Sequence, residues 1–230
     1  MTFLNRKVLA EFLGTTVFLT AIVGASAAGS PLRQASLAIA LGLMILLFGP
    51  ISGGHFNPAV SVYFYSTKAL DFKGLAGYIL AQLTGGIAGA WLGITIWGGS
   101  LHYGGQSATN LIPQLAGEVL ATAGLVTLIG QLVITKRENI IWVVVALWVF
   151  AAGTFTQTGA QANPAVSLAL IFAGHSFTDQ ALVIIAEFLG MLLAVILLVT
   201  LNAKPGKVAK KPVGRKYEKL LDYKYVKGQL

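Results

Sequence analysis

The 230-residue chain contains no cysteine, which excludes disulfides, thiolate metal sites and cysteine redox chemistry. Charged residues are also scarce: they make up 10% of the composition, against about 25% in soluble domains. Acidic residues number 8 and basic residues 16, while hydrophobic residues make up 56% of the chain. This composition predicts an integral membrane protein.

The formal net charge of +8 is unevenly distributed along the sequence. Nine of the sixteen Lys and Arg residues fall within residues 204–230. Basic clusters next to a membrane span are typical of segments that lie beside anionic lipid. We therefore expect a membrane-embedded domain over residues 1–203, a basic cytoplasmic tail over 204–230, membrane lipids as partners and no nucleic-acid partner.

The apolar segments fall into two length classes. Six are long enough to cross the bilayer, at residues 8–28, 34–52, 75–97, 113–134, 140–157 and 180–201. Residues 58–67 and 164–173 are too short to cross about 30 Å of hydrocarbon at about 1.5 Å per residue. Irregular backbone is tolerated at that depth only where it is buried or lines a cavity. The sequence predicts an all-α membrane protein with six transmembrane helices and two re-entrant half-helices.

The basic residues between the spans predict the orientation. Fifteen of the sixteen Lys and Arg residues fall on one side of the membrane in this arrangement, and only Arg33 falls on the other. The positive-inside rule then places both termini in the cytoplasm.

One pentapeptide, Asn-Pro-Ala-Val-Ser, occurs at residues 57–61 and again at 163–167. Asn is a preferred helix N-cap, and Pro suits the first helical position. Glu11 precedes the first copy by 46 residues, and Glu118 precedes the second by 45. Because three spans make an odd number, the second copy is inserted upside down. The halves 1–98 and 113–203 therefore form an inverted repeat, with the special site expected near the midplane.

The two half-helices should meet there with their N-termini. Each N-terminus carries roughly half a positive charge and unpaired N–H groups. Asn57 and Asn163 cap these helices and still offer N–H donors to a passing oxygen. A neutral molecule with lone pairs is favoured at such a site, whereas a cation is repelled.

These features resemble those of the aquaporins and aquaglyceroporins, the major intrinsic proteins, over about residues 8–201. The resemblance rests on the repeat and on three stretches: residues 10–15, residues 52–60 with Asn57-Pro58-Ala59, and residues 158–165 with Asn163-Pro164-Ala165. It implies a homotetramer with one pore per subunit, passive conduction of water or small neutral solutes, and no cofactor. It also implies that loop carbonyls before each Asn line the pore, at Gly53, Gly54, His55, Phe56, Gly159, Ala160, Gln161 and Ala162.

The sequence departs from this family at one constriction position. The family usually has Arg three residues after the second Asn, and this chain has Val166. Counting from the two Asn residues, the other constriction positions are Leu37, Ala151 and Ala160. These four side chains carry no charge and no hydrogen-bond donor. We therefore expect a wide, apolar filter that admits water and neutral solutes such as glycerol, urea, ammonia, hydrogen peroxide or arsenous acid.

Three glutamates lie within the predicted spans, and one histidine lies in the first re-entrant loop. The resemblance suggests that Glu11 and Glu118 accept hydrogen bonds from the re-entrant loops; a proton relay is the alternative. Glu187 is less clearly assigned, because its repeat partner is the neutral Gln82. His55 is interpreted as part of the loop scaffold, with a pH gate as the alternative.

The same features are compatible with other classes of membrane protein. A plain water-selective aquaporin and a secondary transporter both stay open, although a transporter needs converging carboxylates at an ion site. An enzyme is not expected, since no nucleophile, base and orienting group recur near the midplane. The compact loops favour a bacterial inner membrane.

Overall fold

The computed structural model describes residues 3–97 and 111–203. The chain divides into two compact units, Met1–Leu198 and Val199–Leu230, and the description below concerns the first. The tail predicted over 204–230 and the link 98–110 lie outside the described residues.

The regular structure of the described residues is entirely helical. In chain order the elements are α1 Phe3–Ala27, α2 Arg33–Ser52, α3 Pro58–Ser66, α4 Phe72–Trp97, α5 Leu111–Ile134, the 3-10 turn η1 Glu138–Ile140, α6 Ile141–Phe155, α7 Pro164–Phe172 and α8 Phe177–Leu201. Among these ranges, six helical segments are long and apolar enough to cross a membrane. The predicted fold of six spans and two half-helices is confirmed.

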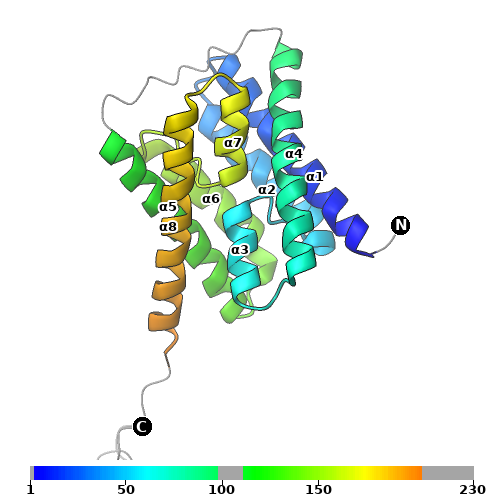
Figure 1. The fold of residues 1–230 in the computed structure, drawn as a ribbon, viewed down its shortest axis with the longest axis vertical. Helices are drawn as coiled ribbons and strands as arrows, with labels where there is room; N and C mark the ends of the chain where they lie inside the picture. Colours follow the sequence, from blue (N-terminus) through cyan, green and yellow to red (C-terminus); the bar gives the residue numbers. More distant parts are fainter. Residues whose placement is uncertain (1–2, 98–110, 204–230) are drawn as a thin grey trace, which may run out of the picture. The chain divides into compact units, whose positions relative to one another are not determined.

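The two short helices begin where the Asn-Pro pairs predict. Asn57 has extended backbone, and its side-chain Oδ1 accepts hydrogen bonds from the N–H groups of Ala59 at 2.9 Å and Val60 at 3.4 Å. Asn163 caps α7 in the same way, through the N–H of Ala165 at 3.0 Å. Because each cap satisfies first-turn donors locally, both helices can begin inside the protein. Figure 1 shows α3 and α7 one above the other among the long helices.

Helices α1 and α4 pack closely through glycines. A Cβ on Gly89 would overlap the carbonyl oxygen of Thr16 and lie 2.8 Å from Cβ of Leu19. A Cβ on Gly85 would lie 2.6 Å from the carbonyl oxygen of Phe12. These contacts bring the two backbones together, as small residues commonly do between membrane helices. The approach fixes α1 and therefore Glu11 against the first re-entrant loop.

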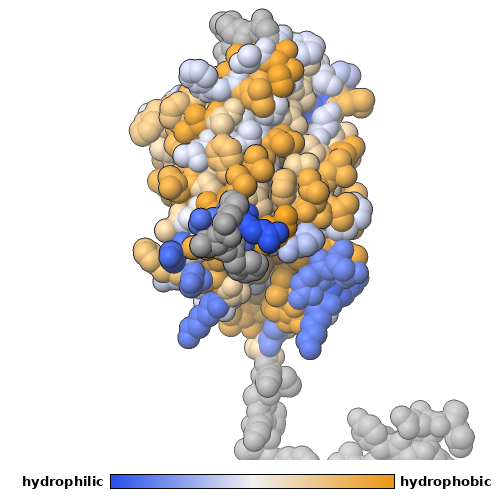
Figure 2. Space-filling view, turned by 90° about the vertical axis from the view of Figure 1, so that its right-hand side faces the viewer, coloured by the Kyte–Doolittle hydropathy of each residue, from blue (hydrophilic) through white to orange (hydrophobic). Residues whose placement is uncertain are grey.

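The outward-facing side chains are largely apolar, as a lipid-facing surface requires. Leu80 on α4 is 66% exposed, Leu147 on α6 63% and Ile196 on α8 62%. Figure 2 shows apolar side chains over the middle of one face, with the strongly hydrophilic ones gathered toward one end. The polar groups described next are instead buried inside the bundle.

Candidate functional site

The two re-entrant loops share one backbone conformation. Positive φ occurs at matched positions before each Asn: at Gly53, Gly54 and Phe56 in the first loop, and at Gly159, Ala160 and Ala162 in the second. Three of these six are not glycine, and such residues cost of order 1–3 kcal/mol each in this region. The surroundings must therefore hold both loops in place.

A buried carboxylate holds the first loop. Glu11 on α1 is fully buried, and it accepts hydrogen bonds from the N–H groups of His55 at 3.0 Å and Phe56 at 2.6 Å. It also accepts from the Ser52 hydroxyl at 2.6 Å and the Gln82 amide at 2.8 Å. Loop donors that would otherwise be unpaired in an apolar interior are thereby satisfied.

Glu118 on α5 occupies the corresponding place in the second repeat. It accepts hydrogen bonds from the N–H groups of Gln161 at 3.0 Å and Ala162 at 2.7 Å, and from the hydroxyl of Thr158. Both glutamates named from the sequence thus contact the loop of their own repeat.

A third carboxylate supports only the second loop. Glu187 on α8 accepts hydrogen bonds from the N–H of Asn163 at 2.8 Å and the hydroxyl of Ser167 at 2.7 Å. Its repeat partner Gln82 instead donates to Glu11 and, at 2.9 Å, to the Ser61 hydroxyl. The sequence left the place of Glu187 open, because a neutral repeat partner gives no indication of a contact to the loop.

The two Asn side chains bond across the repeat boundary. Nδ2 of Asn57 donates to the carbonyl of Ala162 at 2.7 Å, and Nδ2 of Asn163 donates to that of Phe56 at 2.9 Å. These bonds occupy two carbonyls that the family resemblance assigned to the pore wall. An amide nitrogen has two N–H groups, so each Asn retains a second donor beside its cross-bond.

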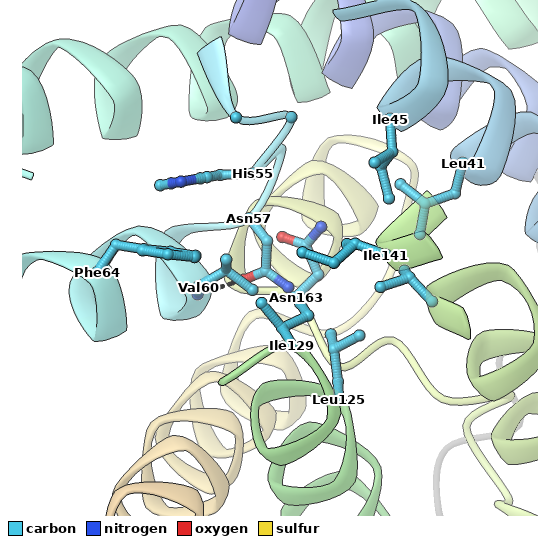
Figure 3. Close-up of a pocket in the computed structure, with 13 residues that line it drawn as sticks. Leu41, Ile45, His55, Asn57, Val60, Phe64, Leu125, Ile129, Ile141 and Asn163 are labelled. Atoms are coloured by element: carbon cyan, nitrogen blue, oxygen red, sulfur yellow. Dashed lines mark hydrogen bonds between the residues drawn. The ribbon is translucent and has the colours of Figure 1, made fainter. Parts of the chain in front are cut away.

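Both Asn side chains line a small central cavity of about 40 Å³ (Figure 3). Asn57 and Asn163 lie side by side at its polar wall, with backbone of Gly53 and Gly54 nearby. The other wall is apolar and consists of Leu41, Ile45, Val60, Leu125, Ile129, Ile141 and Val145. The cavity therefore offers hydrogen bonds on one side and apolar contact on the other.

His55 lines this cavity with a fixed ring. Its Nδ1 lies 3.1 Å from the Ser61 hydroxyl, and the ring stacks on Phe64 with centroids 4.5 Å apart. The repeat-related pair is Gln161 and Ser167, whose side chains hydrogen-bond at 2.7 Å. This matched contact shows that positions 55 and 161 anchor their loops to the first turn of the following half-helix.

Two further cavities lie on either side of the central one along α2. We call them the Trp142 cavity, of about 520 Å³, and the Arg33 cavity, of about 20 Å³. One turn-spaced stripe of α2 passes through all three: Arg33 and Leu37 line the Arg33 cavity, Leu41 and Ile45 the central one, and Ile45 and Gly49 the Trp142 cavity. A spacing of four residues places these positions on one helix face.

The Arg33 cavity contains three of the four predicted filter positions. Leu37, Ala160 and Val166 line it together, whereas Ala151 on α6 is exposed and does not line it. The expectation of a wide filter without charge needs correction here. Arg33 lines the same cavity, and its volume of about 20 Å³ is close to the roughly 10–15 Å³ that a cavity needs to hold one water molecule, so it is narrow. The ungapped count from the Asn residues did not place Arg33, which lies one turn before Leu37.

Of the predicted loop residues, Gly53, Gly54 and His55 line the central cavity, and Gly159, Ala160 and Gln161 line the Arg33 cavity. Phe56 and Ala162 are buried beside the cross-bonds instead. Within the described residues no cluster of three metal-ligating side chains occurs.

Two capped half-helices joined by their Asn side chains, inside a bundle of membrane-length helices, define the fold of a membrane channel. The chain belongs to the Major intrinsic protein family, whose model matches residues 1–203; these are channels, not enzymes.

Relatives and a solved structure agree with this assignment. The chain is 34% identical over 209 residues to the aquaglyceroporin AqpS of Rhizobium meliloti, covering 85% of this chain and 89% of that protein. It is 35% identical to glycerol uptake facilitator protein-like 6 of Lactiplantibacillus plantarum, covering 82% and 94%. The aquaglyceroporin structure from Plasmodium falciparum superimposes with a TM-score of 0.68 at 20% identity, covering 86% of this chain and 94% of that one.

Proposed function

We propose that this protein conducts water and small neutral solutes passively across the membrane, with glycerol, urea, hydrogen peroxide, ammonia and uncharged metalloid acids such as arsenous acid as candidate solutes. The observation that carries the proposal is the amphipathic lining of the cavities along α2. Leu37, Leu41 and Ile45 form an apolar wall, and Asn57 and Asn163 provide donors at its centre.

Conduction follows from this lining. A solute with hydroxyl or amide groups exchanges its water for hydrogen bonds to the loops and the Asn amides, while its C–H groups contact the apolar wall. The N-termini of α3 and α7 add partial positive charge at the same level. A cation therefore loses hydration and meets an unfavourable field, whereas a neutral solute does not.

The solute class is supported by the names of two relatives. The Rhizobium protein is called an aquaglyceroporin and the Lactiplantibacillus protein a glycerol uptake facilitator-like protein. Position 166 also agrees with this class, because Val166 presents apolar surface at the Arg33 cavity.

A second candidate is a water-selective channel. The specific observation in its favour is the 20 Å³ volume of the Arg33 cavity, together with the guanidinium there. A cavity of this size has room for a water molecule and favours water over a larger solute such as glycerol.

The assembly and topology proposed for the chain follow the family resemblance and the charges. We infer a homotetramer with one pore per subunit, in which apolar surfaces such as that of Leu147 face lipid or a neighbouring copy. Both termini face the cytoplasm, most simply that of a bacterial cell, which places Arg33 on the outer side.

Stopped-flow measurements on reconstituted vesicles test the function. Vesicles are exposed to gradients of glycerol, urea, hydrogen peroxide and arsenous acid, with a pH-sensitive dye inside in a parallel experiment. We expect solute permeability above that of empty liposomes without proton leak. Water flux without any of these solutes would favour the water-selective candidate, and light scattering in mild detergent determines the oligomeric state.

A further inference from the structure

We propose that Arg33 of α2 is a selectivity-determining residue, supplying at the outer constriction the cationic donor that position 166 does not provide. The inference rests on the proposed function in one respect, that the cavities along α2 form the conduction route. It adds a residue from a different element of the fold, α2, whose side chain lies against the second re-entrant loop at Gly159.

The cavity lining carries the first step. Arg33 lines the Arg33 cavity with Leu37, Ala160 and Val166, three of the positions at which a constriction is expected. Among the described residues around this cavity, Arg33 bears the charge, and the others are neutral. The guanidinium is a planar cation with five N–H donors.

The position of the guanidinium is set by the second re-entrant loop. Nη2 of Arg33 lies 2.9 Å, and Nε2 of Gln34 lies 2.8 Å, from the point that a Cβ on Gly159 would occupy. Gly159 also has φ +76°, a conformation that side chains rarely adopt. Only glycine at this position leaves room for both side chains against the loop.

The helix geometry carries the second step. Arg33 is the first residue of α2, and it begins the stripe that continues through Leu37, Leu41 and Ile45 along the cavities. A residue at this register faces the same way as Leu37. Arg33 is only partly buried, which fits a guanidinium at the mouth of the route rather than one sealed in the core.

The chemistry of the constriction follows from this arrangement. One wall offers guanidinium donors and the other the apolar side chain of Val166. The guanidinium donates hydrogen bonds to a neutral solute with lone pairs, and it repels a cation before the cation reaches the level of Asn57 and Asn163. Arg33 therefore restricts solute size and strengthens the barrier to cations at one point.

Substitution of Arg33 tests the proposal directly. In reconstituted vesicles, Arg33→Ala is expected to raise the glycerol-to-water permeability ratio by roughly tenfold, because the shorter side chain widens the constriction; tenfold corresponds to about 1.4 kcal/mol in the barrier. It should also raise proton leak across a pH gradient. Arg33→Lys keeps the charge, so its leak should stay near that of the wild type. Arg137→Ala, at an exposed site outside the three cavities, is the control and should change neither quantity.

The absence of cysteine permits a second test on folded protein. Arg33→Cys should gain permeability as Arg33→Ala does, and should lose it again on labelling with a thiol reagent that attaches an ethylammonium group. A neutral methylating thiol reagent should not restore the proton barrier. Ser36→Cys, exposed on the same helix, should label without any change in flux.

The outcomes separate the two proposals. If the wild type passes glycerol and Arg33→Ala, shown to be folded by circular dichroism, has an unchanged ratio and leak, the proposal for Arg33 is overturned while the channel function stands. If the wild type passes only water and Arg33→Ala admits glycerol, the solute assignment fails while Arg33 is supported as the selectivity residue.

Discussion

The side-chain amide of Asn57 donates a hydrogen bond of 2.7 Å to the backbone carbonyl of Ala162, in the opposite repeat. The reverse bond, from Asn163 to the carbonyl of Phe56, is 2.9 Å long. Each Asn thus caps its own half-helix with Oδ1 and fixes the other loop with Nδ2. The two loops form one cross-linked unit, in which neither carbonyl is left unpaired in the interior.

Removing one Asn should weaken both the cap and the cross-bond. Asn163→Ala is expected to lower the free energy of unfolding by about 1–3 kcal/mol, because a lost cap costs about 1 kcal/mol and a lost buried hydrogen bond a similar amount. Chemical unfolding in detergent micelles measures this. Asn139→Ala, at an exposed position in η1, is the control; equal losses in both variants would contradict the assigned contacts.

The carboxylate of Glu118 should be irreplaceable by its neutral isostere. It accepts from the N–H groups of Gln161 and Ala162 on different oxygens. In Glu118→Gln the amide nitrogen cannot accept, so one loop donor loses its partner at a cost of about 1–3 kcal/mol. Glu138→Gln, on the exposed turn η1, should leave the melting temperature unchanged. Similar melting curves for the two variants would refute this account of the loop support.

Two glycine-to-alanine substitutions should have opposite signs. In Gly89→Ala the new methyl group meets the carbonyl of Thr16, so α1 and α4 must separate, and we expect a loss of about 1–3 kcal/mol from overpacking. In Gly24→Ala the methyl group meets nothing within 4 Å, and the better helix propensity should add up to about 1 kcal/mol. Thermal unfolding of both variants is the measurement, and destabilisation by Gly24→Ala would show that α1 packs differently.

The features that the sequence predicted well are those with a local cause. The half-helices were expected at 58–67 and 164–173, and they begin at Pro58 and Pro164, because an Asn-Pro pair specifies a helix start by itself. The start of the first long helix was placed at residue 8, whereas α1 begins at Phe3. A span predicted from hydropathy starts at the first residue of the apolar run. The helix itself extends further toward the N-terminus, because the charged residues Arg6 and Lys7 are good helix formers.

Features that depend on packing between elements distant in the sequence could not be predicted from local residue patterns. Phe56, Ala160 and Ala162 adopt positive φ although their residue types give no such signal, because Glu11 and Glu118 hold the loops from distant helices. In the sequence prediction Arg33 enters only as a charge on the outer side of the membrane. Leu37 and Leu41 lie four residues apart on one face of α2, and extending that spacing by one turn toward the N-terminus places Arg33 at the same cavity as Leu37.

His175, in the link between α7 and α8, should make the fold sensitive to mild acid. Burial lowers the pKa of His175 below its usual 6.5, and the positive charge of Arg33 lowers it further. The unfolded chain therefore binds a proton on this residue below about pH 6.5 while the folded chain does not. The contribution of neutral His175 to the free energy of unfolding is fully present above pH 6.5. Below that value stability falls with pH, by at most about 1.4 kcal/mol per pH unit.

The His175→Gln variant lacks this titration, so the difference in unfolding free energy between wild type and variant should change between pH 7.5 and pH 5. A constant difference over that range would contradict the lowered pKa. Arg33→Ala removes a neighbouring positive charge that disfavours the imidazolium form of His175. The pKa of His175 in the folded protein should then rise toward 6.5, and the loss of stability at pH 5 should be smaller than in the wild type.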